Sequence, residues 1–205
     1  MAHDRDHDEH DHDHGDHDHD HDHEDGPDEQ ERAERAAIRR HALAQIRQYP
    51  DVALRLKAHE VSEFDDDLRR LIERMEHLMV DAQGVGLAAT QVGVLRRLFV
   101  FDPNEEGPCV VVNPRIVDPS KSRETDEEGC LSLQGVRVPV ERSTSVTLEG
   151  KDANGADVQW KLEGLSARVV QHELDHLDGV LIIDITDEAS RKAALGVLRP
   201  QPVIR

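Results

Sequence analysis

Apolar residues recur at helical spacing early in the chain. Between residues 65 and 83 they fall every three or four positions, which predicts a helix with one buried face. These residues are Leu68, Leu71, Ile72, Met75, Leu78 and Met79. Asp65 is suited to cap the start of this helix, and Gly84 is expected to end it. A weaker pattern predicts an earlier helix from about residue 28 to 48, stopped by Pro50.

The pattern changes to that of β-structure between Arg96 and Leu162. Short runs rich in β-branched and aromatic residues predict strands at 98–101, 110–112, 136–140, 145–149 and 158–162. The turn at 151–155 predicts that the last two strands form a hairpin. Helices are expected again at about 165–177 and 187–198. Strands gathered between helices favour a single α+β domain, with short antiparallel strands packed around the helix at 165–177.

Composition sets the first residues apart from the rest. Residues 1–25 hold nine His, twelve Asp or Glu and one Arg, a formal charge of −11 out of −19 for the whole chain. They contain no Leu, Ile, Val, Phe, Tyr or Trp, so they cannot offset the entropy lost on ordering. We expect residues 1–27 to be a disordered tail and residues 28–205 to form the domain.

The remaining sequence excludes several classes of protein. It carries a moderate charge of −8 without a basic run, so nothing in it indicates nucleic-acid binding. No apolar run approaches the ~20 residues that span a bilayer. The N-terminus is acidic from Asp4 onward and lacks the basic start of a signal peptide. We therefore expect a cytoplasmic protein without membrane contact.

The segment His172–His176 carries the pattern H-E-x-x-H within the predicted helix at 165–177. Positions i and i+4 share one helix face, so both imidazoles can reach one metal ion. Glu173 can then act on a water held by that ion. Leu165 and Val169 lie on the same face, which is expected to point inward. The pattern predicts metal-assisted hydrolysis.

Two histidines leave a catalytic metal one protein ligand short. The chain after His176 contains no His and a single Glu, Glu188, which fits the first turn of a helix better than a metal site. Cys109 begins an apolar strand and fits a buried position. Cys130 follows two acids and a glycine and is the better candidate. Asp175 and Asp178 are candidates for orienting an imidazole.

Three motifs together resemble the peptide deformylase family. The chain has G-x-G-L-A-A-x-Q at 84–91, E-G-C-L-S at 128–132 and Q-H-E-x-D-H at 171–176, in the family's order. The similarity runs from about Ile46 to Asp184 and includes Asn113-Pro114. Thr90 fills a variable position where many members have proline, and we expect at most a small effect on loop rigidity.

The resemblance implies a ligand set and a reaction. Cys130, His172 and His176 would bind one divalent ion, with iron(II) expected and zinc, nickel or cobalt as alternatives. Glu173 would act as general base in removing the formyl group from N-formylmethionine at the amino end of newly made polypeptides, with release of formate. The Gln91 side chain and the Leu131 backbone N–H would stabilise the oxyanion.

The resemblance also implies where the peptide binds. Gly86 would let the peptide backbone approach closely, as an added strand. Val85, Leu165 and Val169 would line the methionine pocket, and Arg137 would face the peptide. The substrates would be N-formylmethionyl nascent peptides at the ribosome.

Two other functions stay open. The first is a metallopeptidase that cuts internal bonds, against which the missing downstream ligand argues. The second is metal storage or delivery by the His-rich tail, whose alternating His and carboxylate groups suit extra zinc, nickel or copper ions. Storage would require neither Glu173 nor Gln91.

Overall fold

The computed structural model describes residues 28–102 and 107–199. The expectation that residues 1–27 form a disordered tail lies outside this described part. Within it, no helix is long and apolar enough to cross a membrane.

Seven strands in the described residues form two antiparallel sheets. The larger sheet has the order β1-β2-β3-β6-β7, with bounds β1 Gly86–Ala88, β2 Leu98–Phe101, β3 Cys109–Val117, β6 Ser145–Lys151 and β7 Asp157–Glu163. The smaller sheet pairs β4, Arg123–Gly129, with β5, Arg137–Ser143. The five predicted strands and the β6–β7 hairpin are therefore confirmed, and most of the strands are longer than predicted.

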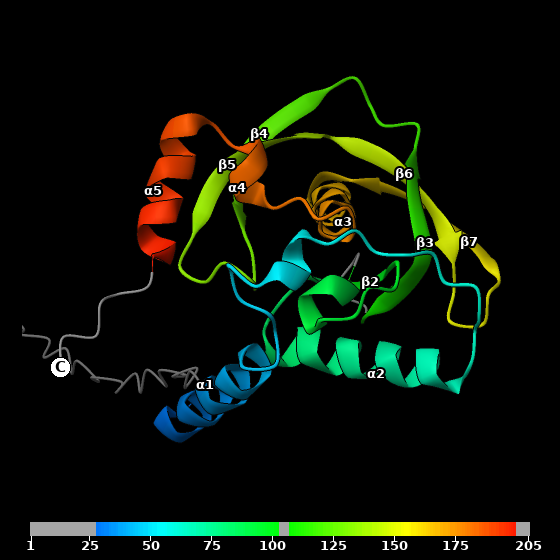
Figure 1. Ribbon diagram of the computed structural model, residues 1–205, viewed down its shortest axis with the longest axis horizontal. Coiled ribbons are helices and arrows are strands. Elements are labelled where there is room, and N and C mark those ends of the chain that lie inside the picture. The colour runs from blue at the N-terminus through cyan, green and yellow to red at the C-terminus, as the bar shows by residue number, and fades with distance from the viewer. Residues whose placement is uncertain (1–27, 103–106, 200–205) are drawn as a thin grey trace, which may run out of the picture.

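Helix α3, Gly164–Leu177, occupies the centre of the fold. Figure 1 shows it nearly end-on, enclosed by strands of both sheets. Its buried residues Ala167, Val170 and Leu177 share a core with Phe99 and Leu148 of the large sheet. The α+β fold expected from the sequence is confirmed, and the helix that carries H-E-x-x-H is held from several sides.

Helix α2, Asp66–Asp81, covers β1 and β2 with its apolar face. Its predicted cap is confirmed, because Asp65 accepts a hydrogen bond from the Leu68 N–H at 2.9 Å. The helix ends three residues before Gly84. Gln83, with φ of 58°, makes the left-handed turn that was expected of the glycine.

Helix α1, Glu29–Leu43, ends five residues earlier than predicted. The next residues bond to distant loops instead of continuing the helix. The Arg47 N–H donates to the Gln91 carbonyl at 2.7 Å, and the Tyr49 N–H donates to the Ser132 carbonyl at 2.9 Å. The segment 44–49 therefore bonds to two of the motifs, the one that ends at Gln91 and the one that ends at Ser132.

Several elements were not predicted from the sequence. Strand β4 is rich in exposed acidic residues, and β1 is only three residues long within a glycine-rich run. Helix α4, Ile182–Ile185, is a single turn.

Helix α5, Glu188–Leu198, was predicted and is capped by Asp187, whose side chain accepts from the Ala189 and Ser190 N–H groups. Glu188 thus lies in a first helical turn, as expected.

Candidate active site

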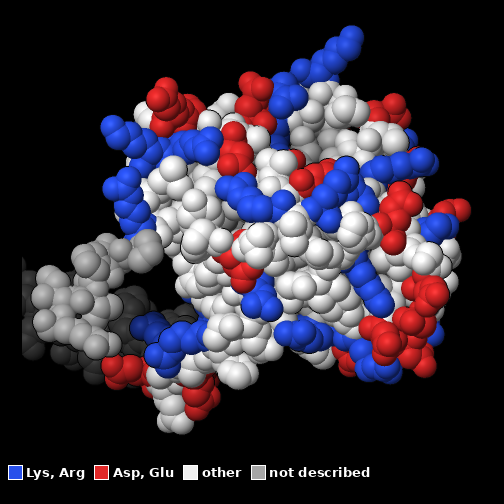
Figure 2. Space-filling view, viewed as in Figure 1, with Lys and Arg blue, Asp and Glu red and all other residues white. Residues whose placement is uncertain are grey.

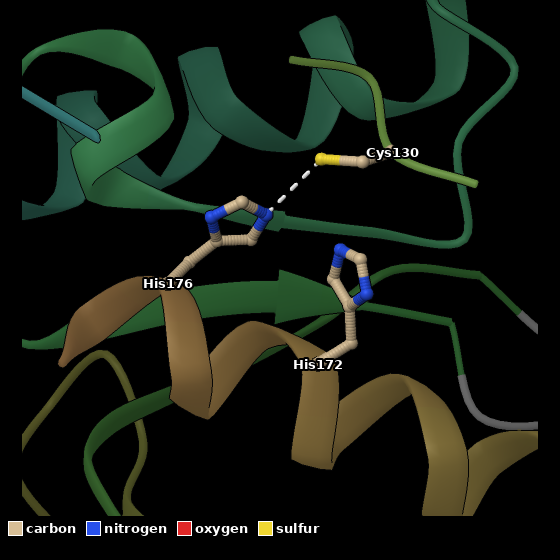
Figure 3. Close-up of side chains that lie close together, drawn as sticks. All are labelled: Cys130, His172 and His176. Atoms are coloured by element: carbon tan, nitrogen blue, oxygen red, sulfur yellow. Dashed lines mark hydrogen bonds between the residues drawn. The ribbon is translucent and has the colours of Figure 1, made fainter. Parts of the chain in front are cut away.

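Three predicted ligands converge between α3 and the end of β4. Their ligand atoms all lie within 4.8 Å of one another. The Cys130 sulfur is 3.2 Å from the His176 Nε2 atom, and the two imidazole centres are 4.9 Å apart. Figure 3 shows both rings rising from one side of α3 toward the Cys130 side chain. The structure therefore brings together residues that lie more than 40 positions apart in the sequence.

Glu128 fixes the orientation of His172. One carboxylate oxygen lies 3.0 Å from the His172 Nδ1 atom, so the Nε2 lone pair is left for a metal. Burial acts to raise the pKa of Glu128, but hydrogen bonds from His172 and Arg142 outweigh it and lower that pKa to about 2. Glu128 is thus a charged acceptor with only 5 % of its surface exposed.

Two arginines hold Glu128 in place. Arg142 donates to both of its carboxylate oxygens, at 2.9 and 3.0 Å. Arg168 donates to one of them at 2.9 Å and to the Val140 carbonyl at 2.8 Å. Both arginines are buried, so each charge is matched inside the fold.

The expectation that Asp175 or Asp178 orients an imidazole was wrong. Asp175 pairs with Arg142, and Asp178 pairs with Arg97 at 2.8 Å. Closeness to a histidine in the sequence does not make a residue its hydrogen-bond partner, because successive helical residues point in different directions. Glu128, on a neighbouring strand, is the residue that reaches the ring.

The donor set fits a metal ion of intermediate softness. Burial and the nearby His172 lower the pKa of His176 well below its usual value, which keeps the ring in its neutral, metal-binding form. Burial acts to lower the pKa of His172 as well, but hydrogen bonds with Cys130 and Glu128 raise it well above its usual value. A metal ion bound by His172 would have to displace the proton from its Nε2 atom. One thiolate and two imidazoles suit iron(II) or zinc and disfavour magnesium and calcium.

Glu173 lies beside the ligands with its carboxylate buried. Its Oε2 atom has no hydrogen-bond partner among the described residues. Burial raises the pKa of this carboxyl to about 7. A buried carboxylate next to a metal site, with one oxygen unused, is suited to exchange a proton with a water molecule.

Gly86 makes room for Glu173. A Cβ atom built on Gly86 would lie 2.4 Å from the Glu173 Oε1 atom, a distance that real Cβ contacts do not show. Its role was expected to be close approach of a peptide backbone. The structure adds a different requirement, since any side chain at residue 86 would displace the carboxylate.

Gln91 and Thr90 lie in the short 3-10 helix η2, Ala89–Val92, where both are buried. The Gln91 side chain accepts from the Ala88 N–H at 2.8 Å and donates to the Ser132 hydroxyl at 3.1 Å. Its Nε2 atom lies 3.7 Å from the Cys130 sulfur. The Thr90 hydroxyl donates to the His176 carbonyl at 3.1 Å, a bond that proline could not make.

Leu131 follows Cys130 directly. Its carbonyl accepts a hydrogen bond from the Gln48 side chain at 3.0 Å. Gln48 belongs to the segment 44–49, whose position the sequence pattern misassigned. The loop that carries Cys130 and Leu131 is thus held by a residue from outside all three motifs.

A cavity of about 630 Å³ opens beside these groups. It is lined by all five residues predicted to bind the peptide, Val85, Gly86, Arg137, Leu165 and Val169. The expectation that this face of α3 points inward is confirmed for Val169 and His176, which are 7 % and 1 % exposed, and was wrong for Leu165, which is 66 % exposed. Val85 is 50 % exposed. Leu165 and Val85 both form cavity wall. Arg39, Leu43, Gln83 and Gln134 also line it and were not predicted from the sequence.

The family model that matches this chain and the similar proteins named below all belong to one family. The model of the family described as polypeptide deformylase matches residues 43–192. A peptide deformylase of Thermodesulfovibrio yellowstonii is 46% identical over 147 residues, which cover 70% of this chain and 88% of that protein. Peptide deformylase 1 of Corynebacterium glutamicum is 47% identical over 161 residues, which cover 77% and 95%.

Solved structures agree with this assignment. The crystal structure of peptide deformylase from Thermotoga maritima has 46% identity and a TM-score of 0.67, and it covers 69% of this chain and 96% of that chain. A structure from Legionella pneumophila has 41% identity and a TM-score of 0.71. The chain belongs to the peptide deformylase family, metal-dependent hydrolases that remove the formyl group from the amino end of polypeptides.

Proposed function

We propose that deformylation by this chain is carried out by a water molecule placed between the Cys130, His172 and His176 side chains and the Glu173 carboxylate. The observation that carries this proposal is the position of the buried Glu173, which lines the same cavity as Cys130 and His172 and has one oxygen unpaired among the described residues. Bound by the three ligands, a divalent ion would polarise the formyl carbonyl and lower the pKa of a water molecule.

Glu173 moves one proton through the reaction. It takes the proton from the water as the water oxygen attacks the formyl carbon, and it gives that proton to the departing amine nitrogen as the C–N bond breaks. The products are formate and a free amino terminus. The raised pKa of Glu173 favours this exchange, because a base that must return its proton works best when its pKa is close to the working pH.

Gln91 and Leu131 stabilise the oxyanion in this proposal. The Gln91 amide is fixed at its oxygen by Ala88 and directs its nitrogen toward the Cys130 loop. The Leu131 N–H belongs to the same loop. The Gln91 amide is held in place before the reaction, so it needs little rearrangement when negative charge develops on the formyl oxygen.

The methionine side chain would occupy the apolar part of the cavity, lined by Val85, Leu165 and Val169. Arg137 would face the peptide from β5. The exposure of Val85 and Leu165 supports this, since apolar side chains in a cavity wall gain burial when a ligand covers them.

Iron(II) is the metal we propose, and zinc, nickel and cobalt are the alternatives. A thiolate and the iron(II) that it holds are both open to oxidation, so metal analysis must use protein purified without oxygen. Iron at one ion per catalytic centre supports the proposal, and zinc alone under those conditions contradicts it.

We further propose that the chain acts in the cytoplasm on nascent peptides at the ribosome, and that residues 1–27 form a disordered tail that concentrates metal near the site. The tail is tested by titrating metal into the full chain and into a chain lacking residues 1–25. Equal stoichiometry and equal recovery of activity from the metal-free form would reject a reservoir.

One assay separates deformylation from its alternatives. Iron-loaded protein is incubated with formyl-Met-Ala-Ser, and formate is measured. Release of formate supports the proposal. Cleavage of casein without formate release would indicate a peptidase, and neither activity with many ions bound per chain would indicate storage.

A further inference from the structure

Helix α1 lies ahead of the region that the family model matches. The match begins at residue 43, and α1 spans Glu29–Leu43. The helix nevertheless belongs to the folded domain, because its Ala42 and Leu43 share a core with Met79 and Ala82 of the α2 end. Figure 1 places α1 beside α2.

Arg39 brings this helix to the active-site cavity. It lines the cavity together with Leu43, and its Nε atom donates to the Ala82 carbonyl at 3.2 Å. That bond ties the Arg39 side chain to the residue that precedes Gln83, Gly84 and Val85, which line the same cavity. Among residues 28–102 and 107–199, no carboxylate lies within ion-pair distance of Arg39, so its charge stays available to a ligand.

The surroundings of Arg39 in the cavity are neutral. The other residues that α1 and the segment 83–85 contribute to the lining are Leu43, Gln83, Gly84 and Val85, and all of them are uncharged. The exposed acid of the lining, Glu127, belongs to the strand pair β4–β5, which also carries Arg137. Arg39 is therefore the charged residue that α1 and the segment 83–85 together contribute to the cavity lining.

The path of the peptide follows from the site. Its formyl end must lie at Glu173, which is in contact with Gly86. Strand β1 pairs only with β2 in the described part of the sheet, so its other edge is free to bind an added strand. An antiparallel strand on that edge runs from Gly86 back toward Gln83, and three residues of strand cover about 10 Å.

We propose that Arg39 is a specificity-determining residue that favours acidic side chains at the third and fourth positions of the formyl peptide. This rests on the proposed function and adds the class of substrate. The effect belongs to binding, because Arg39 bonds to Ala82 and to none of the residues assigned to the chemistry, and so it changes KM more than kcat.

The test compares amidated peptides that differ only in charge. The substrates are formyl-Met-Ala-Glu-Glu, formyl-Met-Ala-Gln-Gln and formyl-Met-Ala-Lys-Lys, and each kcat/KM is divided by that for formyl-Met-Ala. Wild type should prefer the Glu-Glu over the Gln-Gln peptide by about two- to fivefold, as exposed ion pairs allow. The preference should decline as salt is added.

Variants assign the preference to one residue. Arg39→Gln should abolish it, and Arg39→Glu should reverse it in favour of the Lys-Lys peptide. Arg40→Gln removes the same charge from the adjacent exposed residue, which does not line the cavity, and should keep the preference. A wild type without preference, or an Arg39→Gln variant that behaves like Arg40→Gln, overturns the proposal. Turnover of formyl-Met-Ala by wild type tests the proposed function separately.

Discussion

Glu128 shows how one residue depends on partners from several elements. It lies on β4 and bonds His172 and Arg168 of α3 and Arg142 of β5. The sequence motif contains Glu128, yet nothing in the pattern marks it as the partner of His172. That role depends on burial between two arginines whose positions only the fold determines. The two histidines, in contrast, could be predicted from their spacing, and the resemblance to the family implied Cys130 as the third ligand.

Replacing Glu128 tests this role. Glu128→Gln should lower the free energy of unfolding by about 3–5 kcal/mol, since it leaves buried arginines without their charge partner. It should also weaken metal binding about 10- to 100-fold, since His172 loses its charged acceptor. Urea unfolding and competition with a chelator measure the two effects. Glu127→Gln, at the exposed neighbour, is the control, and equal behaviour of both variants would contradict the assignment.

At the scale of elements, β1 and α3 must approach closely for the site to form. The contact falls at Gly86 and Glu173, and the sequence indicated only that residue 86 needs to be small. The segment 44–49 was harder to predict. Its apolar spacing continued that of α1, but its backbone bonds to Gln91 and Ser132, which are distant in the sequence. Strand β4 was missed for a similar reason, since pairing with β5 outweighs its low strand propensity.

Two glycines provide a matched test of the β1–α3 contact. Gly86→Ala should lower kcat at least about tenfold, because the new methyl group displaces the Glu173 carboxylate. Gly84→Ala should have a smaller effect, because its Cβ would meet the end of the flexible Leu131 side chain. Neither glycine has a positive φ, so backbone strain does not enter. Equal loss of kcat in both variants would contradict this explanation.

In the whole molecule, the buried apolar residues form three clusters, and α3 belongs to the cluster that it shares with β2, β3, β6 and β7. On the face seen in Figure 2, acidic and basic side chains are interspersed and do not form one large patch. The α+β class and the presence of a helix at 165–177 followed from the sequence pattern. The participation of α1 in the cavity did not, because it depends on packing of α1 against the end of α2.

Removal of the metal should lower the free energy of unfolding of the whole domain. A ligand at about 100 times its Kd stabilises the folded state by about 2.7 kcal/mol. For a domain of this size that corresponds to a Tm about 5–10 °C higher for the metal-loaded protein than for the metal-free protein. Calorimetry of both forms measures the shift. Cys130→Ala should show little response to metal, and a response equal to that of wild type would place the stabilising ion elsewhere.

In the proposed mechanism, Glu173 acts as a base and does not bind the metal. This assignment is tested most directly by measuring metal content and formate release on the same preparation of Glu173→Ala. We expect this variant to have the metal content of wild type and to release formate from formyl-Met-Ala-Ser more slowly by a factor of about 100 or more. Loss of the metal together with the activity would make Glu173 a ligand, and undiminished formate release would remove it from the mechanism.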